Sequence, residues 1–171
     1  LMLIAYKKKR LWETMGSLNV SDQEIIDVFE KDLSFTRAVG VYNQLWSIKS
    51  KLFSRLSKKG VARCDEETEA YRDLCKDIVT EFSSTDMSFE SLHLYHHILS
   101  AYYYAIGELS SSLMHVEVNL GGIDKKDLAK RVEANQYVSA LTNAIYISDK
   151  IGEHRKSVEY LAQLKMFTAS T

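Results

Sequence analysis

Three side chains that can bind metal share one face of a predicted helix. Glu90, His93 and His97 stand at positions i, i+3 and i+7, so they point to the same side of an α-helix. Two imidazoles with a carboxylate can hold zinc, and a small metal protein or enzyme centred on this trio is one hypothesis. A di-iron site needs a second Glu-x-x-His, and the chain has none. We favour rings that pack against tyrosines and hydrogen-bond internally, and expect no metal and no cofactor.

Motifs for an activated nucleophile or a phosphate cradle are absent from the sequence. The chain lacks G-x-S-x-G, G-x-x-x-x-G-K-[ST], G-x-G-x-x-G, H-E-x-x-H and the calcium-loop pattern. Each of these motifs places reactive or ligand-binding groups through a defined backbone geometry. We therefore do not expect an enzyme, although folding can also bring acid–base pairs together from distant positions.

The elements that position all these residues are predicted to be helices. The chain has 171 residues, no proline and 7 glycines, whereas average usage gives about eight prolines and about twelve glycines. Apolar residues recur at three- and four-residue steps, and no window of comparable length alternates as a strand does. With 46% hydrophobic and 26% charged residues the chain can bury a core. We predict an all-α fold of antiparallel helical hairpins in a single domain over residues 1–171.

Glycines and capping residues predict where the helices begin and end. Ser34 is expected to start a new helix after residue 33, and Ser88 to cap the helix that carries the histidines, because serine is a favoured N-cap. Ser21 and Asp124 are expected to cap two others. The predicted helices cover residues 1–15, 21–33, 35–59, 65–82, 89–106, 109–120, 125–150 and 158–167.

Two segments share a helix, an Ile-Gly-Glu turn and a second amphipathic helix. The turns are residues 106–108 and 151–153. This pattern resembles the helix–turn–helix unit of tetratricopeptide repeat proteins over residues 89–166. The matching positions in the two copies are Leu99, Ser100, Tyr103, Ser112, Val116, Ser157 and Leu161.

The sequence departs from this family in several places. The turn glycines lie 45 residues apart, where the family period is about 34. Eleven added residues make about three whole helical turns, so a longer helix keeps its apolar face in register. Ile145, Ser148 and Asn119 also differ from the family pattern, and the closing proline is missing. An irregular helical bundle is the alternative arrangement.

The resemblance implies a concave groove, lined by the leading helix of each hairpin, that binds peptides. Counting ten, six and three residues back from each turn glycine places six residues in it: His97, Ala101, Tyr104, Thr142, Tyr146 and Asp149. This set has no Lys, Arg or Asn, so a terminal carboxylate is not implied. The predicted function is a non-catalytic module for protein–protein or peptide interaction, serving as a sensory or scaffolding part of a larger protein.

Charge is unevenly distributed along the chain, although the net charge is only −1. A basic stretch over 37–63 with aromatic neighbours is typical of nucleic-acid binding, the second alternative. Residues 65–90 hold nine acids, and we favour a hairpin in which the two helices align opposite charges along a shared edge. We therefore expect no nucleic-acid partner. The seven basic residues are Arg37, Lys49, Lys51, Arg55, Lys58, Lys59 and Arg63.

The sequence predicts no membrane span within the chain. The uncharged run over residues 91–107 has only 17 residues and three histidines, which suits a buried helix. Cys64 and Cys75 would lie about 16 Å apart along one helix, too far for a disulfide. Two unpaired thiols favour a reducing compartment, so we expect a cytoplasmic location. The chain opens with Leu1 and not with methionine, and we expect it to be a fragment of a longer chain.

Overall fold

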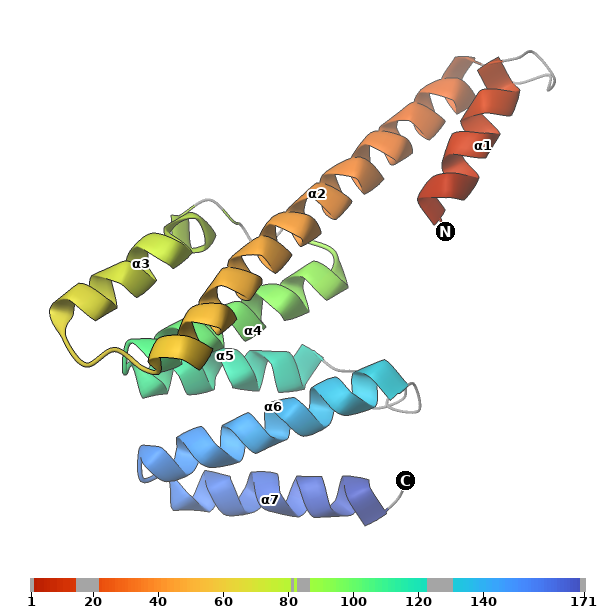
Figure 1. The fold of residues 1–171 in the computed structure, drawn as a ribbon. Helices are drawn as coiled ribbons and strands as arrows, with labels where there is room; N and C mark the ends of the chain where they lie inside the picture. The colour runs from red at the N-terminus through yellow and green to blue at the C-terminus, as the bar shows by residue number, and fades with distance from the viewer. Residues whose placement is uncertain (1, 15–21, 81, 83–86, 123–130, 170–171) are drawn as a thin grey trace. The chain divides into compact units, whose positions relative to one another are not determined.

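The computed structural model describes residues 2–14, 22–80, 82, 87–122 and 131–169 (Figure 1). Its described elements are all α-helices and this part of the chain contains no strand, so the all-α prediction is confirmed. The contacts fall into two units, Leu1–Gln44 and Leu45–Thr171. The helices are α1 (Met2–Thr14), α2 (Asp22–Lys59), α3 (Asp65–Thr80), α4 (Phe89–Ala105), α5 (Leu109–Gly122), α6 (Arg131–Lys150) and α7 (His154–Ala169).

The caps predicted from the sequence have different outcomes. Ser88 does cap α4, because its Oγ accepts a hydrogen bond from the amide of Ser91 at 3.2 Å. Ser34 does not begin a helix, and α2 runs through it without a break. Serine caps a helix only where the chain has left the preceding one, and no glycine or proline near Ser34 ends that helix. Ser21 and Asp124 lie outside the described residues.

The unit Leu1–Gln44 contains α1 and the first part of α2. The guanidinium of Arg10 bonds to the buried carboxylate of Asp32 at 2.9 Å and lies 4.2 Å from the centre of the Phe29 ring. Tyr6 packs on Phe35 with 5.2 Å between ring centres. One ion pair and two aromatic contacts thus join α1 to α2 inside this unit.

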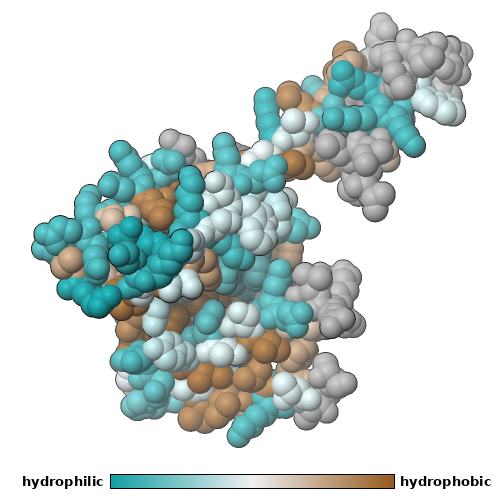
Figure 2. Space-filling view, in the orientation of Figure 1, coloured by the Kyte–Doolittle hydropathy of each residue, from teal (hydrophilic) through white to brown (hydrophobic). Residues whose placement is uncertain are grey.

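The unit Leu45–Thr171 is a succession of helices that pack on their neighbours in the chain. Helices α4, α5 and α6 each contact the next helix in the chain and run antiparallel to it, and α3 contacts α4 (Figure 1). On the face seen in Figure 2, polar side chains gather over α3 and apolar ones over the C-terminal helices. None of the helices in the described ranges is both long and apolar enough to cross a membrane.

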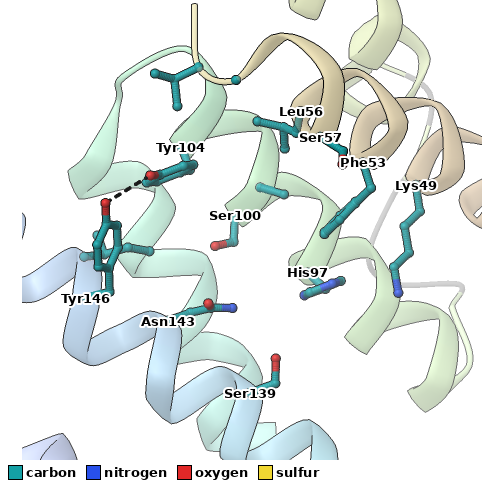
Figure 3. Close-up of a pocket in the computed structure, with 14 residues that line it drawn as sticks. Lys49, Phe53, Leu56, Ser57, His97, Ser100, Tyr104, Ser139, Asn143 and Tyr146 are labelled. Carbon is teal, nitrogen blue, oxygen red and sulfur yellow. Dashed lines mark hydrogen bonds between the residues drawn. The ribbon is translucent and has the colours of Figure 1, made fainter.

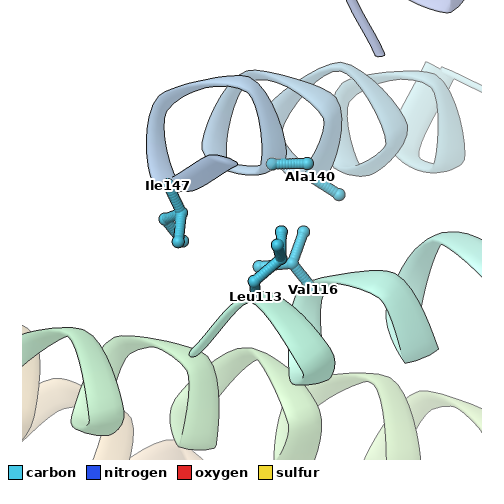
Figure 4. Packing of buried hydrophobic residues seen from close by; sticks show 5 residues of the cluster. Leu113, Val116, Ala140 and Ile147 are labelled. Atoms are coloured by element: carbon cyan, nitrogen blue, oxygen red, sulfur yellow. The ribbon is translucent and has the colours of Figure 1, made fainter. Parts of the chain in front are cut away.

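The core between α5 and α6 is built from small and branched side chains. Leu113 and Val116 of α5 face Ala140, Ala144 and Ile147 of α6, all of them buried (Figure 4). The two alanines let the helices approach closely, because an alanine adds only a methyl group to the interface. Serines serve the same purpose between α4 and α5, where the Ser112 hydroxyl donates to the backbone carbonyl of Ser100 at 2.8 Å.

Polar contacts link alternate helices on the side of α5 and α7. The carboxylate oxygen Oε1 of Glu117 accepts hydrogen bonds from the Tyr160 hydroxyl at 2.7 Å and from the Lys156 ammonium at 3.1 Å. Lys156 also pairs with Glu153 at 2.9 Å. Because Glu117 lies on α5 and its two donors lie on α7, these bonds fix α7 relative to the hairpin before it.

Helix α3 presents a buried stripe of Tyr71, Cys75 and Ile78. Burial raises the pKa of the Cys75 thiol to about 12, whereas Cys64 is exposed, and both cysteines are free. Tyr71 also connects α3 to the chain before it, since its hydroxyl donates to the carbonyl of Gly60 at 2.5 Å.

The two Ile-Gly-Glu turns have the same backbone geometry. Gly107 and Gly152 have φ values of 82° and 80°. In the first turn the amide of Glu108 donates to Tyr103 O at 2.9 Å, and in the second turn the amide of Glu153 donates to Ser148 O at 2.9 Å. In both turns the glycine amide bonds to the carbonyl three residues earlier, which completes a Schellman motif.

Replacing Gly152 by alanine is expected to destabilise the protein by roughly 1–2 kcal/mol, since an L side chain resists a positive φ. Added methyl groups at Gly152 and at Gly121 would both meet no atom within 4 Å, so the difference between the two sites lies in the backbone. Gly121→Ala, in helical conformation, should stabilise by up to about 1 kcal/mol. Urea denaturation of both variants measures the change in the free energy of unfolding. If both substitutions changed it in the same direction, the requirement for glycine at position 152 would be contradicted.

Candidate functional site

A groove of about 990 Å³ lies between α2, α4 and α6, entirely within the unit Leu45–Thr171 (Figure 3). Helix α4 lies between the two others along it, and α2 and α6 contribute its sides. Two residues that follow the end of α2 also line the groove. The lining residues are Lys49, Phe53, Leu56, Ser57, Gly60, Val61, His97, Ser100, Ala101, Tyr104, Ser139, Asn143, Tyr146 and Ile147.

Of the six residues predicted to line a groove, the structure brings four together. His97, Ala101, Tyr104 and Tyr146 line it. Thr142 and Asp149 do not line the groove, because α6 presents a neighbouring stripe that contains Ser139 and Asn143. The hydroxyl of Thr142 instead bonds to the carbonyl of Val138 at 2.8 Å, and Asp149 pairs with the His154 ring at 3.1 Å.

Two tyrosines form one end of the groove. The hydroxyl of Tyr104 on α4 donates to that of Tyr146 on α6 at 3.4 Å, and their ring centres are 6.1 Å apart (Figure 3). This bond raises the pKa of Tyr104 and lowers that of Tyr146, to which the Lys150 ammonium also contributes. The phenol pair spans the two helices and presents both a flat apolar surface and polar oxygens.

The other end of the groove combines stacked rings with a cation. His97 stacks on Phe53 with ring centres 5.3 Å apart, and the ammonium of Lys49 lies 4.5 Å from the centre of the Trp46 ring. Burial lowers the pKa of His97 to about 4, with further lowering by Lys49 and His93, and burial also lowers the pKa of Lys49. At neutral pH the imidazole of His97 is therefore uncharged, and the positive charge at this end belongs to Lys49.

Ten of the fourteen lining residues were not anticipated from the sequence, and three of them are polar or aromatic side chains at the centre and one end of the groove. Lys49 and Phe53 belong to α2, and Asn143 belongs to α6. The spacing of Trp46, Lys49 and Phe53 at i, i+3 and i+7 was the available signal for an aromatic and basic stripe on one helix face. The spacing does not indicate which other helix this stripe faces.

The proposed metal ligands Glu90, His93 and His97 do not form a ligand set. Within the described ranges no group of three or more His, Cys, Asp or Glu is placed to hold a metal ion. Glu90 is exposed, and burial is the first cause of the lowered pKa of His93. His97 is engaged in the stack with Phe53. The zinc hypothesis therefore has no geometric support here.

A second cluster of rings lies between α4 and α5. The Nδ1 atoms of His96 and His115 are 2.9 Å apart, so one imidazole donates and the other accepts. Tyr103 stacks on His115 with ring centres 5.4 Å apart and 6° between planes. Burial lowers the pKa of His115 to about 4, and His96 adds to the effect. The pair requires at least one ring to be unprotonated on Nδ1.

The consecutive tyrosines of α4 enter different environments. Tyr102 is buried, Tyr103 stacks on His115, and Tyr104 lines the groove. Tyr104 therefore faces a different surface from Tyr102. One hundred degrees per residue separates their directions, so a single run of tyrosines serves the core, the α4–α5 contact and the groove.

The basic stretch and the acidic helix are in contact through a cation and an aromatic ring. No ion pair between described residues joins α2 to α3. Instead, the guanidinium of Arg55 lies 5.0 Å from the centre of the Tyr71 ring, and Arg63 pairs locally with Glu67 at 4.0 Å. Between the described residues of α2 and α3, the contact is this cation and ring, and the edge of opposite charges stays a prediction.

Comparisons of the chain with protein-family models, with curated proteins and with solved structures find no match. The groove brings apolar, aromatic and polar side chains of three helices to one place.

Proposed function

We propose that this chain is a non-catalytic helical interaction module that binds a segment of a partner protein in the groove between α2, α4 and α6. The observation that carries the proposal is the groove itself, about 990 Å³ in volume, at the upper end of the range typical of ligand sites, about 300–1,000 Å³. Aromatic residues at both ends supply contact area with little loss of conformational entropy, as in other recognition surfaces.

Its size and lining suit a peptide segment. His97 and Tyr104 are separated by seven residues of α4, a rise of about 10 Å. An extended peptide covers this distance in about three residues, whereas a helical segment needs about seven. The small residues Ser100 and Ala101 between the two ends leave room for the side chains of such a segment.

A tetratricopeptide-like arrangement of the hairpins belongs to the same proposal. In its support, the two turns share one hydrogen-bond pattern. Contacts between alternate helices occur on both sides, through Tyr104 and Tyr146 on the groove side and through Glu117 and Tyr160 on the other. Such contacts are what a stack of equivalent hairpins requires.

Blocking the groove should abolish peptide binding. Peptides selected from a displayed random library on the unmodified chain are expected to lose at least about tenfold in affinity for Ser139→Trp, because an indole there occupies space that the peptide needs. Ser139 is exposed and lines the groove, so the variant should fold. Fluorescence anisotropy with labelled synthetic peptides gives the affinities.

Ser110→Trp is the matched control, since Ser110 is an exposed helical serine that does not line the groove. It should bind the selected peptides as the unmodified chain does. Peptides that bind both tryptophan variants equally well, or a library that yields no binder at all, would remove the support for this function.

A further inference from the structure

Resting on that function, we propose that the occupant of the groove is an internal peptide segment that places an aspartate or glutamate side chain against Lys49 and an apolar or aromatic side chain near Tyr104 and Tyr146. His97, which lies at the Lys49 end of the groove, is about 10 Å along α4 from Tyr104, so the two anchoring side chains would be about three residues apart in an extended segment. This inference specifies which side chains the partner segment carries, whereas the proposed function specifies only that a segment binds in the groove.

The charge of the groove carries the first part of this inference. Lys49 is the one lysine or arginine among the lining residues, and these residues include no aspartate or glutamate. Lys49 takes part in none of the ion pairs formed among the described residues. A half-buried ammonium without a carboxylate attracts an anionic group more strongly than a fully solvated one does.

The surroundings of Lys49 favour a side-chain carboxylate. The Trp46 ring lies 4.5 Å from the ammonium and the Phe53 ring 5.7 Å from it. The methylene groups of an aspartate or glutamate can pack on these rings while the carboxylate reaches the ammonium. A chain terminus would instead need several converging donors to hold its two oxygens, as in carboxylate-capture sites, and only Lys49 offers a charge here.

The α6 side of the groove supports a segment that continues through it. The side chains of Asn143 and Ser139 line the groove between its two ends (Figure 3) and form no hydrogen bond with another described residue. Their donors and acceptors are available to the peptide groups of a passing chain, as in other complexes with extended peptides. Tyr104 and Tyr146 then provide the apolar anchor at the far end.

Charge reversal tests this inference on the whole chain. Peptides would be selected from a displayed random library on the unmodified chain and, in parallel, on Lys49→Glu. We expect Asp or Glu to be enriched about three residues from an apolar residue in the first selection and Lys or Arg to be enriched at that position in the second. For a synthetic peptide from the first selection, changing its acidic residue to lysine should weaken binding by about tenfold and should restore binding to Lys49→Glu.

Two further variants separate charge from folding. Lys49→Met keeps an unbranched side chain of similar size without the charge, and it should lose the preference for the acidic peptide while still binding its apolar part. Lys51→Glu makes the same change of charge at an exposed position outside the groove and should select the same peptides as the unmodified chain.

The outcomes distinguish this inference from the function on which it rests. If peptides bind in the groove, as judged by their loss on Ser139→Trp, but show no acidic preference or the same preference on Lys49→Glu, the acidic partner is wrong and the interaction module stands. A preference that depends only on a free peptide C-terminus would also overturn it. If no selected peptide is sensitive to Ser139→Trp, both ideas fail.

Discussion

Leu141→Ala is expected to destabilise the Leu45–Thr171 unit by about 2–5 kcal/mol, the range for truncating a fully buried leucine. Leu141 is 0% exposed, and with Tyr137 it forms the cluster on which Leu164 and Phe167 of α7 pack. Removing three carbon atoms there leaves a cavity between two helices that cannot both move inward. Urea denaturation followed by far-ultraviolet circular dichroism measures the change in unfolding free energy.

Leu161→Ala provides the matched comparison, because Leu161 lies on α7 with 39% of its surface exposed. Its truncation removes less buried area and should cost less than about 1 kcal/mol. Similar losses for the two leucines would show that α6 and α7 do not pack as described. The comparison therefore tests the last hairpin independently of any ligand.

Acidification should destabilise the fold between about pH 6.5 and pH 4. The pKa values of His97 and His115 are both lowered from 6.5 to about 4, in each case first by burial. In this window the unfolded chain binds more protons than the folded one, so the free energy of unfolding falls as the pH falls. Well above pH 6.5 both rings are neutral in either state, and their contribution to stability is complete.

The expected loss for the two histidines together is roughly 2–4 kcal/mol, less than the full 1.4 kcal/mol per pKa unit because solvent screens the partly exposed rings. Protonation of both rings of the pair would also break the bond between His115 and His96, since both Nδ1 atoms would then be donors. Denaturation curves at a series of pH values measure the slope.

The double variant His97→Asn with His115→Asn should flatten this dependence over the window. Leu141→Ala serves as the control, because it lowers stability without removing a titrating group and should therefore keep the slope. An unchanged slope in the double variant would mean that other groups, such as carboxylates, dominate the acid response.

Helix boundaries could be predicted from the sequence wherever a residue has a conformational requirement. Gly107 and Gly152 end their helices because their positive φ is accessible to glycine, and Ser88 caps α4 because its side chain reaches the amide of Ser91. Ser34 misled the prediction, since a serine inside a helix has the same local sequence signature as one at its start. Nothing in the neighbouring residues forces the chain to leave α2 there.

The groove could be predicted only in part for a related reason. The offsets from Gly107 that the resemblance implies select His97, Ala101 and Tyr104, and all three line the groove, because positions on one helix can be counted from the local sequence. The rotation of α6, which presents Asn143 and not Thr142, depends on how its alanines pack on α5. The contribution of α2 depends on a contact between segments about 45 residues apart, such as Phe53 with His97, for which a single sequence contains no signal.

The two thiols differ in exposure and in reactivity, so the unmodified chain can be labelled at one site to follow binding in the groove. Cys75 is buried and its raised pKa keeps it protonated, whereas Cys64 is exposed and lies four residues after Gly60, which lines the groove. Thiol-specific reagents react with the accessible thiolate form, so a maleimide dye would attach at Cys64 and leave Cys75 untouched. Fluorophore emission would then follow occupancy of the groove without any engineered attachment point.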